Sequence, residues 1–179
     1  MFYLFLADGF EETEALAPLD MMRRAKIEVK TVGVTGEFVT GSHGVTVKAD
    51  LKPEEISFKN IDGVVLPGGM PGTINLGKSE TVTKAAVYCA ENGKITAAIC
   101  AAPSVLGNLG ILKGKKATCF PGFEKELEGA TYTAAPVEID GNVITGKGAG
   151  CAILFGKAIV EKAVSAEAAN KVCGDMQCP

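Results

Sequence analysis

The chain has 179 residues and a formal net charge of −3, with its 18 basic and 21 acidic residues scattered along it. This length predicts a single domain over residues 1–179. Without a basic block, nucleic acid is not an expected partner. The opening apolar run, residues 1–6, is too short for a signal peptide, and no later run is long enough to cross a bilayer. We therefore expect a cytoplasmic protein without a membrane segment.

The first half of the chain predicts strands that alternate with helices. Residues 1–6 are apolar without alternation, which is typical of a strand buried on both faces. Residues 11–25 carry apolar side chains at helical spacing. The expected strands are 1–6, 27–34 and 64–66, the expected helix is 11–25, and a small hairpin is expected at 38–40 and 45–47. Residues 67–72 form a Gly-rich loop after the third strand.

The second half continues the alternation. The expected strands are 95–99, 116–120, 137–139 and 142–145, and the expected helices are 79–91, 101–109, 151–164 and 167–172, with one or two helical turns at 123–127. Ser79 is a good helix N-cap, and Asp140-Gly141 is a strong hairpin turn. The alternation predicts an α/β protein with a mostly parallel sheet and helices on both faces.

Ligands of such sheets bind outside the carboxyl ends of the strands. Three predicted loops lie there, after the strands that end at residues 6, 66 and 99. The loops carry, in turn, the carboxylates of the helix start, a Gly-Gly pair and a cysteine: Glu11, Glu12, Glu14, Gly68, Gly69 and Cys100. The topology alone therefore predicts an acid, a Gly-rich backbone and a thiol at one edge of the sheet.

Cys100 ends an apolar strand, and the small residues Ala101 and Ala102 follow it. Small neighbours suit a sharp strand-to-helix turn, and a helix start favours a thiolate. The alternatives stay open at this point. A buried, inert cysteine is common, first-turn glutamates are favoured by the helix dipole, and a Gly-Gly pair is often only a tight turn.

The remaining metal-ligating and thiol residues give weaker signals. The sequence has 6 cysteines but no C-x-x-C pair and only one histidine, His43. A zinc site is therefore not expected, and we predict no metal site. His43 lies in the predicted hairpin turn, where a histidine is most often exposed. Cys173 and Cys178 are near each other in the sequence and could pair.

Three motifs together closely resemble the ThiJ/PfpI superfamily, and its branch of the parkinsonism-associated protein deglycase and bacterial homologues in particular. The motifs are residues 8–14, 66–69 and 97–103, and the segments 19–25 and 145–150 also fit. The resemblance covers the whole chain in order. It implies a flavodoxin-like three-layer sandwich, usually a homodimer, and no cofactor.

The resemblance also implies roles for individual residues. Cys100 would be a nucleophile on a strained elbow, and Glu14 would be a protonated acid that hydrogen-bonds its sulfur. The backbone N–H groups of Gly69 and Ala101, next to Gly68, would bind an oxyanion or the substrate. A neutral acid beside a thiolate is physically reasonable, because the anion raises the acid's pKa and accepts its hydrogen bond.

The sequence departs from the family pattern at two familiar histidine positions. Many relatives have a histidine where Phe120 stands, and the protease-like branch has one where Ala101 stands. Without a Cys–His pair, peptidase chemistry is not expected. His43 falls where the closest relatives carry an arginine in a hairpin. His43, Phe120 and Gly148, the last within segment 145–150, are further candidate site residues.

The implied function is a cysteine-dependent, cofactor-free enzyme that acts on α-oxoaldehydes or their early glycation adducts, of the glyoxalase or deglycase type. The expected partners are a small aldehyde or glycated amine and a second copy of the chain. In the alternative, peroxide oxidises Cys100 to a sulfinate and the protein is a redox-sensing chaperone or partner-binding module. A role in the thiamine pathway is a weaker alternative.

Overall fold

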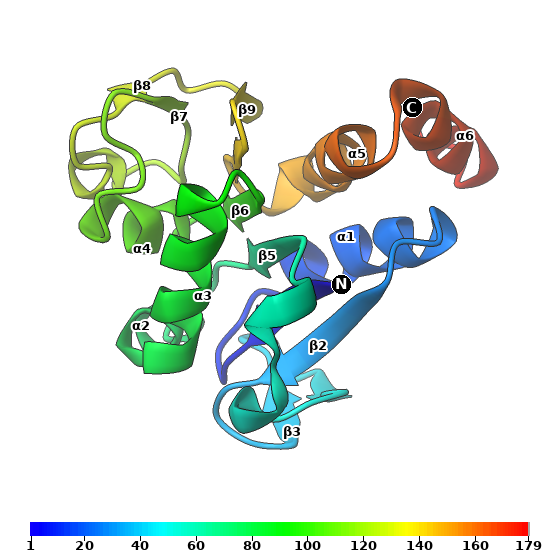
Figure 1. Cartoon of the computed structure of the whole chain (residues 1–179), viewed down its shortest axis with the longest axis horizontal. Helices are drawn as coiled ribbons and strands as arrows, with labels where there is room; N and C mark the ends of the chain where they lie inside the picture. Colours follow the sequence, from blue (N-terminus) through cyan, green and yellow to red (C-terminus); the bar gives the residue numbers. More distant parts are fainter. Residues whose placement is uncertain (179) are drawn as a thin grey trace.

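The computed structural model describes residues 1–178. Its main sheet has six strands in the order β2-β1-β5-β6-β10-β9 (Figure 1). Their bounds are β1 Phe2–Leu6, β2 Val29–Gly33, β5 Gly63–Leu66, β6 Ile95–Ile99, β9 Val137–Asp140 and β10 Val143–Gly146. All neighbours pair in parallel except β9, which is antiparallel to β10. If β1, β2, β5, β6 and β10 are numbered 1 to 5 along the chain, their order in the sheet is 2-1-3-4-5, which is the flavodoxin-like order. The predicted fold class is therefore confirmed.

Helices cover both faces of this sheet (Figure 1). Within residues 1–178 the α-helices are α1 Glu12–Arg24, α2 Gly72–Lys78, α3 Glu80–Glu91, α4 Pro103–Asn108, α5 Ala152–Ala163 and α6 Ala166–Asp175. Successive side chains of a strand point to opposite faces. In β1, Phe2, Leu4 and Leu6 pack with α1, α5 and α6, whereas Tyr3 and Phe5 pack with α2, α3 and α4. The two buried clusters lie on opposite faces of the sheet, so the fold has three layers: helices, sheet and helices.

The predicted hairpin is present as β3 (Phe38–Thr40) and β4 (Thr46–Lys48), which pair antiparallel. It folds back onto the loop between β1 and α1. The Gly9 N–H donates to the Thr40 carbonyl at 2.8 Å, and the Thr40 N–H donates to Asp8 Oδ1 at 2.9 Å. The hairpin therefore lies against the start of α1, where the candidate carboxylates are.

The predicted strand at 116–120 is wrong in length and place. Only Lys116–Ala117 (β7) is a strand, and it pairs with Thr131–Tyr132 (β8) in a separate two-stranded sheet. The following backbone groups have other partners: the Thr118 N–H donates to Thr145 Oγ1 at 2.9 Å, and the Phe120 N–H donates to the Cys100 carbonyl at 2.8 Å. The segment therefore hydrogen-bonds to Cys100 and to Thr145 instead of continuing as a β-strand.

Helix α2 lies in a stretch for which the sequence predicted no element. Its Gly72 and Gly77 disfavour a helix by about 1 kcal/mol each relative to alanine. Tertiary contacts compensate for this: Leu76 is fully buried, and the Thr73 N–H donates to the Gly69 carbonyl at 2.9 Å. Helix α6 is also longer than the predicted 167–172.

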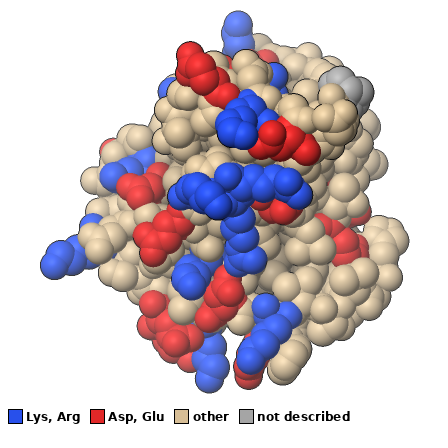
Figure 2. Space-filling model, turned by 90° about the vertical axis from the view of Figure 1, so that its right-hand side faces the viewer, with Lys and Arg blue, Asp and Glu red and all other residues tan. Residues whose placement is uncertain are grey.

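Acidic and basic side chains are interspersed on the face that carries the end of α1 and α6 (Figure 2). Two ion pairs with i,i+4 spacing lie on these helices, Arg24 with Asp20 on α1 and Lys171 with Asp175 on α6. Among residues 1–178, no helix combines the length and the apolar character that crossing a membrane requires.

The predicted N-cap of α3 is confirmed, because Ser79 Oγ accepts the Val82 N–H at 3.4 Å. We expect Ser79→Ala to lower the free energy of unfolding by about 1 kcal/mol, since this N–H loses its partner. Urea denaturation followed by circular dichroism measures the change. Ser79→Asp restores a capping oxygen and should recover most of the loss. An unchanged midpoint in Ser79→Ala would show that this cap contributes nothing.

Candidate active site

The three predicted loops meet at the carboxyl edge of β1, β5 and β6. Gly68 lies at the point where they meet. A Cβ atom placed on Gly68 would lie 2.7 Å from Cys100 Cβ and 2.7 Å from Glu14 Oε2. The meeting point lies where the strand order reverses, between β1 and β5, which is where flavodoxin-like sheets bind ligands. The structure thus brings Glu14, Gly68 and Cys100 together, as the sequence predicted.

Cys100 has the backbone of a strained elbow. Its φ is +65°, a left-handed conformation that non-glycine residues rarely adopt. Two hydrogen bonds hold this turn: the Cys100 N–H donates to the Gly146 carbonyl at 2.9 Å, and the Cys100 carbonyl accepts the Phe120 N–H at 2.8 Å. Helix α4 begins three residues later with Pro103 in its first turn. Such strain persists only where the surroundings impose it, which is common at functional sites.

Glu14 is fully buried, although it is a carboxylic acid. Its Oε2 accepts the Gly68 N–H at 2.9 Å, and its Oε1 accepts no hydrogen bond from an N–H or O–H of the described chain. Burial, with a smaller contribution from the charge of Glu11, raises the pKa of Glu14 to about 7, although its hydrogen bonds to Cys100 and Gly68 oppose the shift. At neutral pH this side chain can therefore both donate and accept a proton.

The sulfur of Cys100 and the carboxyl of Glu14 titrate as a coupled pair. Burial and then the Glu14 carboxylate raise the pKa of Cys100 to about 12, whereas the N–H groups of Ala101 and Gly69 lower it. When Glu14 is protonated its repulsion disappears, and its O–H can donate to the thiolate. The start of α4 alone therefore does not make Cys100 a thiolate: the charge on sulfur depends on a proton on Glu14.

The backbone N–H groups of Gly69 and Ala101 lower the pKa of the Cys100 thiol, because they stabilise negative charge on its sulfur. Gly69 has a φ of +87°, and a Cβ at this position would lie 2.4 Å from the Glu11 nitrogen, so only glycine fits. Fixed N–H donors beside a reactive atom can stabilise the negative charge that develops on a substrate oxygen. The sequence resemblance implies that these two N–H groups bind an oxyanion, and this role stays a prediction.

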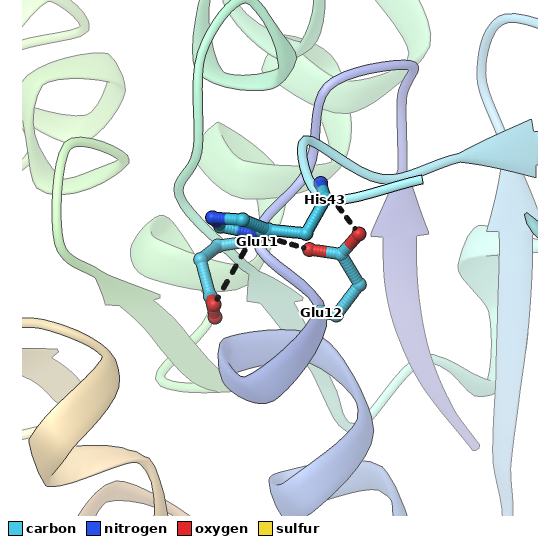
Figure 3. Close-up of side chains that lie close together, drawn as sticks. All are labelled: Glu11, Glu12 and His43. Carbon is cyan, nitrogen blue, oxygen red and sulfur yellow. Dashed lines mark hydrogen bonds and ion pairs between the residues drawn. The ribbon is translucent and has the colours of Figure 1, made fainter. Parts of the chain in front are cut away.

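His43 lies on the hairpin and pairs with Glu12 (Figure 3). Its Nδ1 is 2.9 Å from Glu12 Oε2 and 4.0 Å from Glu11 Oε1, and its side chain is 72% exposed. The hydrogen bond and the charge of Glu12 raise the pKa of His43. Ligand atoms of these three residues lie within 4.8 Å of one another. This cluster holds the hairpin to the start of α1, and the described contacts of His43 do not include Cys100.

Glu11 and Glu12 have separate structural tasks. Glu11 caps α1, because its Oε2 accepts the Glu14 N–H at 2.8 Å. Glu12 Oε1 accepts the backbone N–H of His43 at 2.8 Å and that of Val45 at 3.3 Å. Of the three candidate carboxylates, Glu14 is the one that affects the pKa of the Cys100 thiol.

Phe120 and Gly148 lie beside the elbow without supplying a titratable group. A Cβ on Gly148 would lie 3.3 Å from the Phe120 ring, and Phe120 is half-exposed. The backbone of Phe120 supports the Cys100 carbonyl. Sequence reasoning missed the corresponding role of Gly146, whose carbonyl holds the Cys100 N–H, since no local pattern marks such a contact.

A cavity of about 390 Å³ lies between α2 and α4, next to the site. Met70, which follows the donor Gly69, and Ser104, which donates to the Ala101 carbonyl at 2.6 Å, both line it. Thr73 lines it as well, and its buried hydroxyl has no hydrogen-bond partner in the described chain. Cys100 is not among the lining residues, so the cavity adjoins the thiol instead of enclosing it.

We expect Gly68→Ala to lower the free energy of unfolding by about 1–3 kcal/mol, because the added methyl would overlap Cys100 Cβ and Glu14 Oε2. Chemical denaturation measures the loss. Gly174→Ala is the matched control, because the new methyl would meet no atom within 4 Å outside its own stretch of helix, and alanine favours a helix. If both variants are equally stable, the close packing at Gly68 is not a constraint.

The strand order and the strained turn at Cys100 place this chain among flavodoxin-like α/β proteins with a cysteine on a sharp strand-to-helix turn. The model of the DJ-1/PfpI family matches residues 2–162, and the chain belongs to this family.

Individual relatives agree with this assignment. The Parkinson disease protein 7 homolog of Danio rerio is 38% identical over 176 residues, which are 94% of this chain and 92% of that protein. A protein named deglycase from Pyrococcus abyssi is 33% identical over 144 residues, 79% of this chain and 86% of that protein. The crystal structure of a DJ-1 superfamily protein from Salmonella typhimurium gives a TM-score of 0.94 at 32% identity, covering 99% of this chain and 98% of that one.

Some relatives are much longer. The chain spans 40% and 44% of the lengths of two DJ-1 homologues of Arabidopsis thaliana, to which it is 35% and 34% identical. The match in these proteins covers 96% and 93% of this chain.

Proposed function

We propose that this protein is a cysteine-dependent, cofactor-free enzyme that acts on α-oxoaldehydes or on their early adducts with amines. One observation carries the proposal: Cys100 and the buried acid Glu14 are coupled under two backbone N–H donors. The deglycase names of relatives from Pyrococcus abyssi and Thermococcus kodakarensis support the same chemistry.

The first step is addition of the thiol to the aldehyde carbon. The sulfur forms a bond to that carbon, and the π electrons of the carbonyl move to its oxygen. The N–H groups of Gly69 and Ala101 stabilise this oxygen while its charge develops. Glu14 holds the proton that the thiol loses and passes it to the oxygen, which gives a hemithioacetal.

The second step moves hydrogen within the adduct. Ionised Glu14 removes the proton from the former aldehyde carbon and returns it to the neighbouring ketone carbon. The hydroxyl proton of the former aldehyde moves to the ketone oxygen, and the hemithioacetal becomes a thioester of a 2-hydroxy acid. Water then cleaves the thioester and restores the thiol. Methylglyoxal and water give lactate, and no external electrons are required. A pKa of about 7 suits Glu14 to this task, because the acid and its base are both populated at neutral pH.

An assay of lactate formation tests the proposal. Purified protein is incubated with methylglyoxal, and lactate is measured by nuclear magnetic resonance against buffer and against heat-denatured protein. A parallel reaction contains methylglyoxal premixed with N-acetyl-lysine. It measures whether the free amine returns faster than it would if the protein only removed free methylglyoxal. If neither lactate nor amine appears above the controls, the proposed activity is wrong.

Oxidation of Cys100 is a second candidate function, because the same groups suit a sulfinate. The Glu14 O–H and the N–H groups of Gly69 and Ala101 can donate to sulfinate oxygens. Two equivalents of hydrogen peroxide add two oxygen atoms to the sulfur and release two waters. A solved structure of a relative from Toxoplasma gondii is described as oxidized DJ-1. Peptide mass spectrometry after mild peroxide treatment tests the site, and equal oxidation of all exposed cysteines would contradict it.

A further inference from the structure

The end of α6 has the geometry of a Schellman cap. Gln177 has a left-handed φ of +55°. Its N–H donates to the Gly174 carbonyl at 3.1 Å, and the N–H of Cys178 donates to the Cys173 carbonyl at 2.9 Å. These are the two hydrogen bonds that define this motif, with Met176 as the C-cap.

In a Schellman cap, one backbone hydrogen bond joins two residues that are five positions apart, and the side chains of these two residues lie close together. In most proteins this contact is hydrophobic, but here both residues are cysteines. Cys173 and Cys178 are free thiols and half-buried. After burial, the neighbouring Cys178 thiol is the further cause of the raised pKa of Cys173, through its charge and then through a hydrogen bond between the two thiols. The positive charge of Lys157 on α5 acts in the opposite direction and favours the Cys173 thiolate.

We propose that Cys173 and Cys178 form a redox-active dithiol that a hydroperoxide converts into an intramolecular disulfide. The Cys173 sulfur attacks a peroxide oxygen, the O–O bond breaks and an alcohol or water leaves, which gives a sulfenic acid. The Cys178 sulfur then attacks the oxidised sulfur, the S–O bond breaks and a second water leaves. The peroxide accepts the two electrons that the thiols lose.

The structure distinguishes this pair from the other four cysteines. Cys89 and Cys119 are fully buried, and Cys100 is coupled to Glu14. Cys151 is half-buried and ends the short turn before α5. A disulfide forms without strain only where the two Cα atoms lie about 4.4–6.8 Å apart. The folded cap holds two positions five residues apart in one turn, so the bond would close with little movement of the backbone.

Peptide mapping tests the proposal in the whole protein. The protein is treated with one equivalent of hydrogen peroxide, its free thiols are alkylated, and it is cleaved after Lys171. The peptide of residues 172–179 then contains both cysteines. We expect it to lose two hydrogen atoms and to escape alkylation. The proposal is overturned if both thiols are alkylated under conditions that oxidise Cys100, or if Cys173 is joined to a second chain in a non-reducing gel.

Matched variants separate geometry from simple proximity in sequence. Gln177→Val keeps both thiols but places a β-branched residue at the left-handed position, which it strongly disfavours. Gln177→Gly favours this position. We expect disulfide formation to be at least several-fold slower in Gln177→Val than in Gln177→Gly. Equal rates in the two variants would show that the cap does not align the thiols. Because neither variant touches Cys100, the outcome does not depend on the proposed enzymatic activity.

Discussion

Replacing Cys100 by serine is expected to lower kcat/KM for lactate formation from methylglyoxal by about 10³-fold or more. A serine hydroxyl is a weak nucleophile unless a strong base removes its proton. Glu14, with a pKa of about 7, is too weak a base for that task. Serine has a similar size and the same backbone, so the left-handed turn at this position should be retained. Steady-state kinetics with lactate as the measured product give the value.

Cys178→Ser is the control for this prediction, because it removes a half-buried thiol from the end of α6 and leaves the site intact. It should retain the full rate. Circular dichroism and the unfolding midpoint establish that both variants are folded. If Cys100→Ser keeps more than a tenth of the activity, or if Cys178→Ser loses as much, then lactate does not arise from chemistry at Cys100.

The sheet was predictable from the sequence because its strands carry strong local signals. Residues 1–6 are a continuous apolar run and residues 95–99 are apolar apart from Thr96, and β1 and β6 lie there. The errors fall where tertiary contacts override local preference. Helix α2 contains two glycines but is held by the burial of Leu76. The segment 116–120 looks like a strand but gives its N–H groups to Thr145 and Cys100.

The sequence predicted which loops meet but not which carboxylate faces the sulfur. Parallel strands place their carboxyl ends at one edge, so the meeting of Cys100 with the first helix follows from topology. Glu11, Glu12 and Glu14 differ only in direction around one helical turn. Their separation into a cap, a hairpin anchor and a buried acid depends on Gly68 and His43. These residues lie far along the chain, and their contacts leave no local pattern.

The protonation state of the site was also beyond the sequence. A cysteine at a helix start suggested a thiolate, but burial and the neighbouring acid raise the pKa of Cys100. The size of this effect depends on how completely Glu14 and Cys100 are withdrawn from water. A sequence pattern gives the identity of neighbours in the chain but not the solvent exposure that determines these pKa values.

Because Glu14 is buried, we expect Glu14→Gln to increase the free energy of unfolding at alkaline pH, relative to the unmodified protein. The pKa of Glu14 rises from an ordinary value of 4.5 to about 7 on folding, so the unfolded chain loses this proton at lower pH than the native state does. The stabilisation that comes from the raised pKa is therefore complete below pH 4.5 and is lost as the pH rises through 7. A shift of this size corresponds to about 3 kcal/mol.

Glutamine keeps an oxygen for the Gly68 N–H and places an amide donor toward Cys100, so the variant retains the contacts without the charge. We expect its free energy of unfolding, relative to the unmodified protein, to rise by about 3 kcal/mol between pH 5 and pH 8.5. Urea denaturation at several pH values measures this difference. Glu80→Gln is the control, because pairing with Lys84 lowers the pKa of Glu80 and its removal gives no gain at high pH. If the difference in unfolding free energy between Glu14→Gln and the unmodified protein does not change with pH, then Glu14 is ionised in the native site. The proton shuttle assigned to Glu14 would then lose its basis.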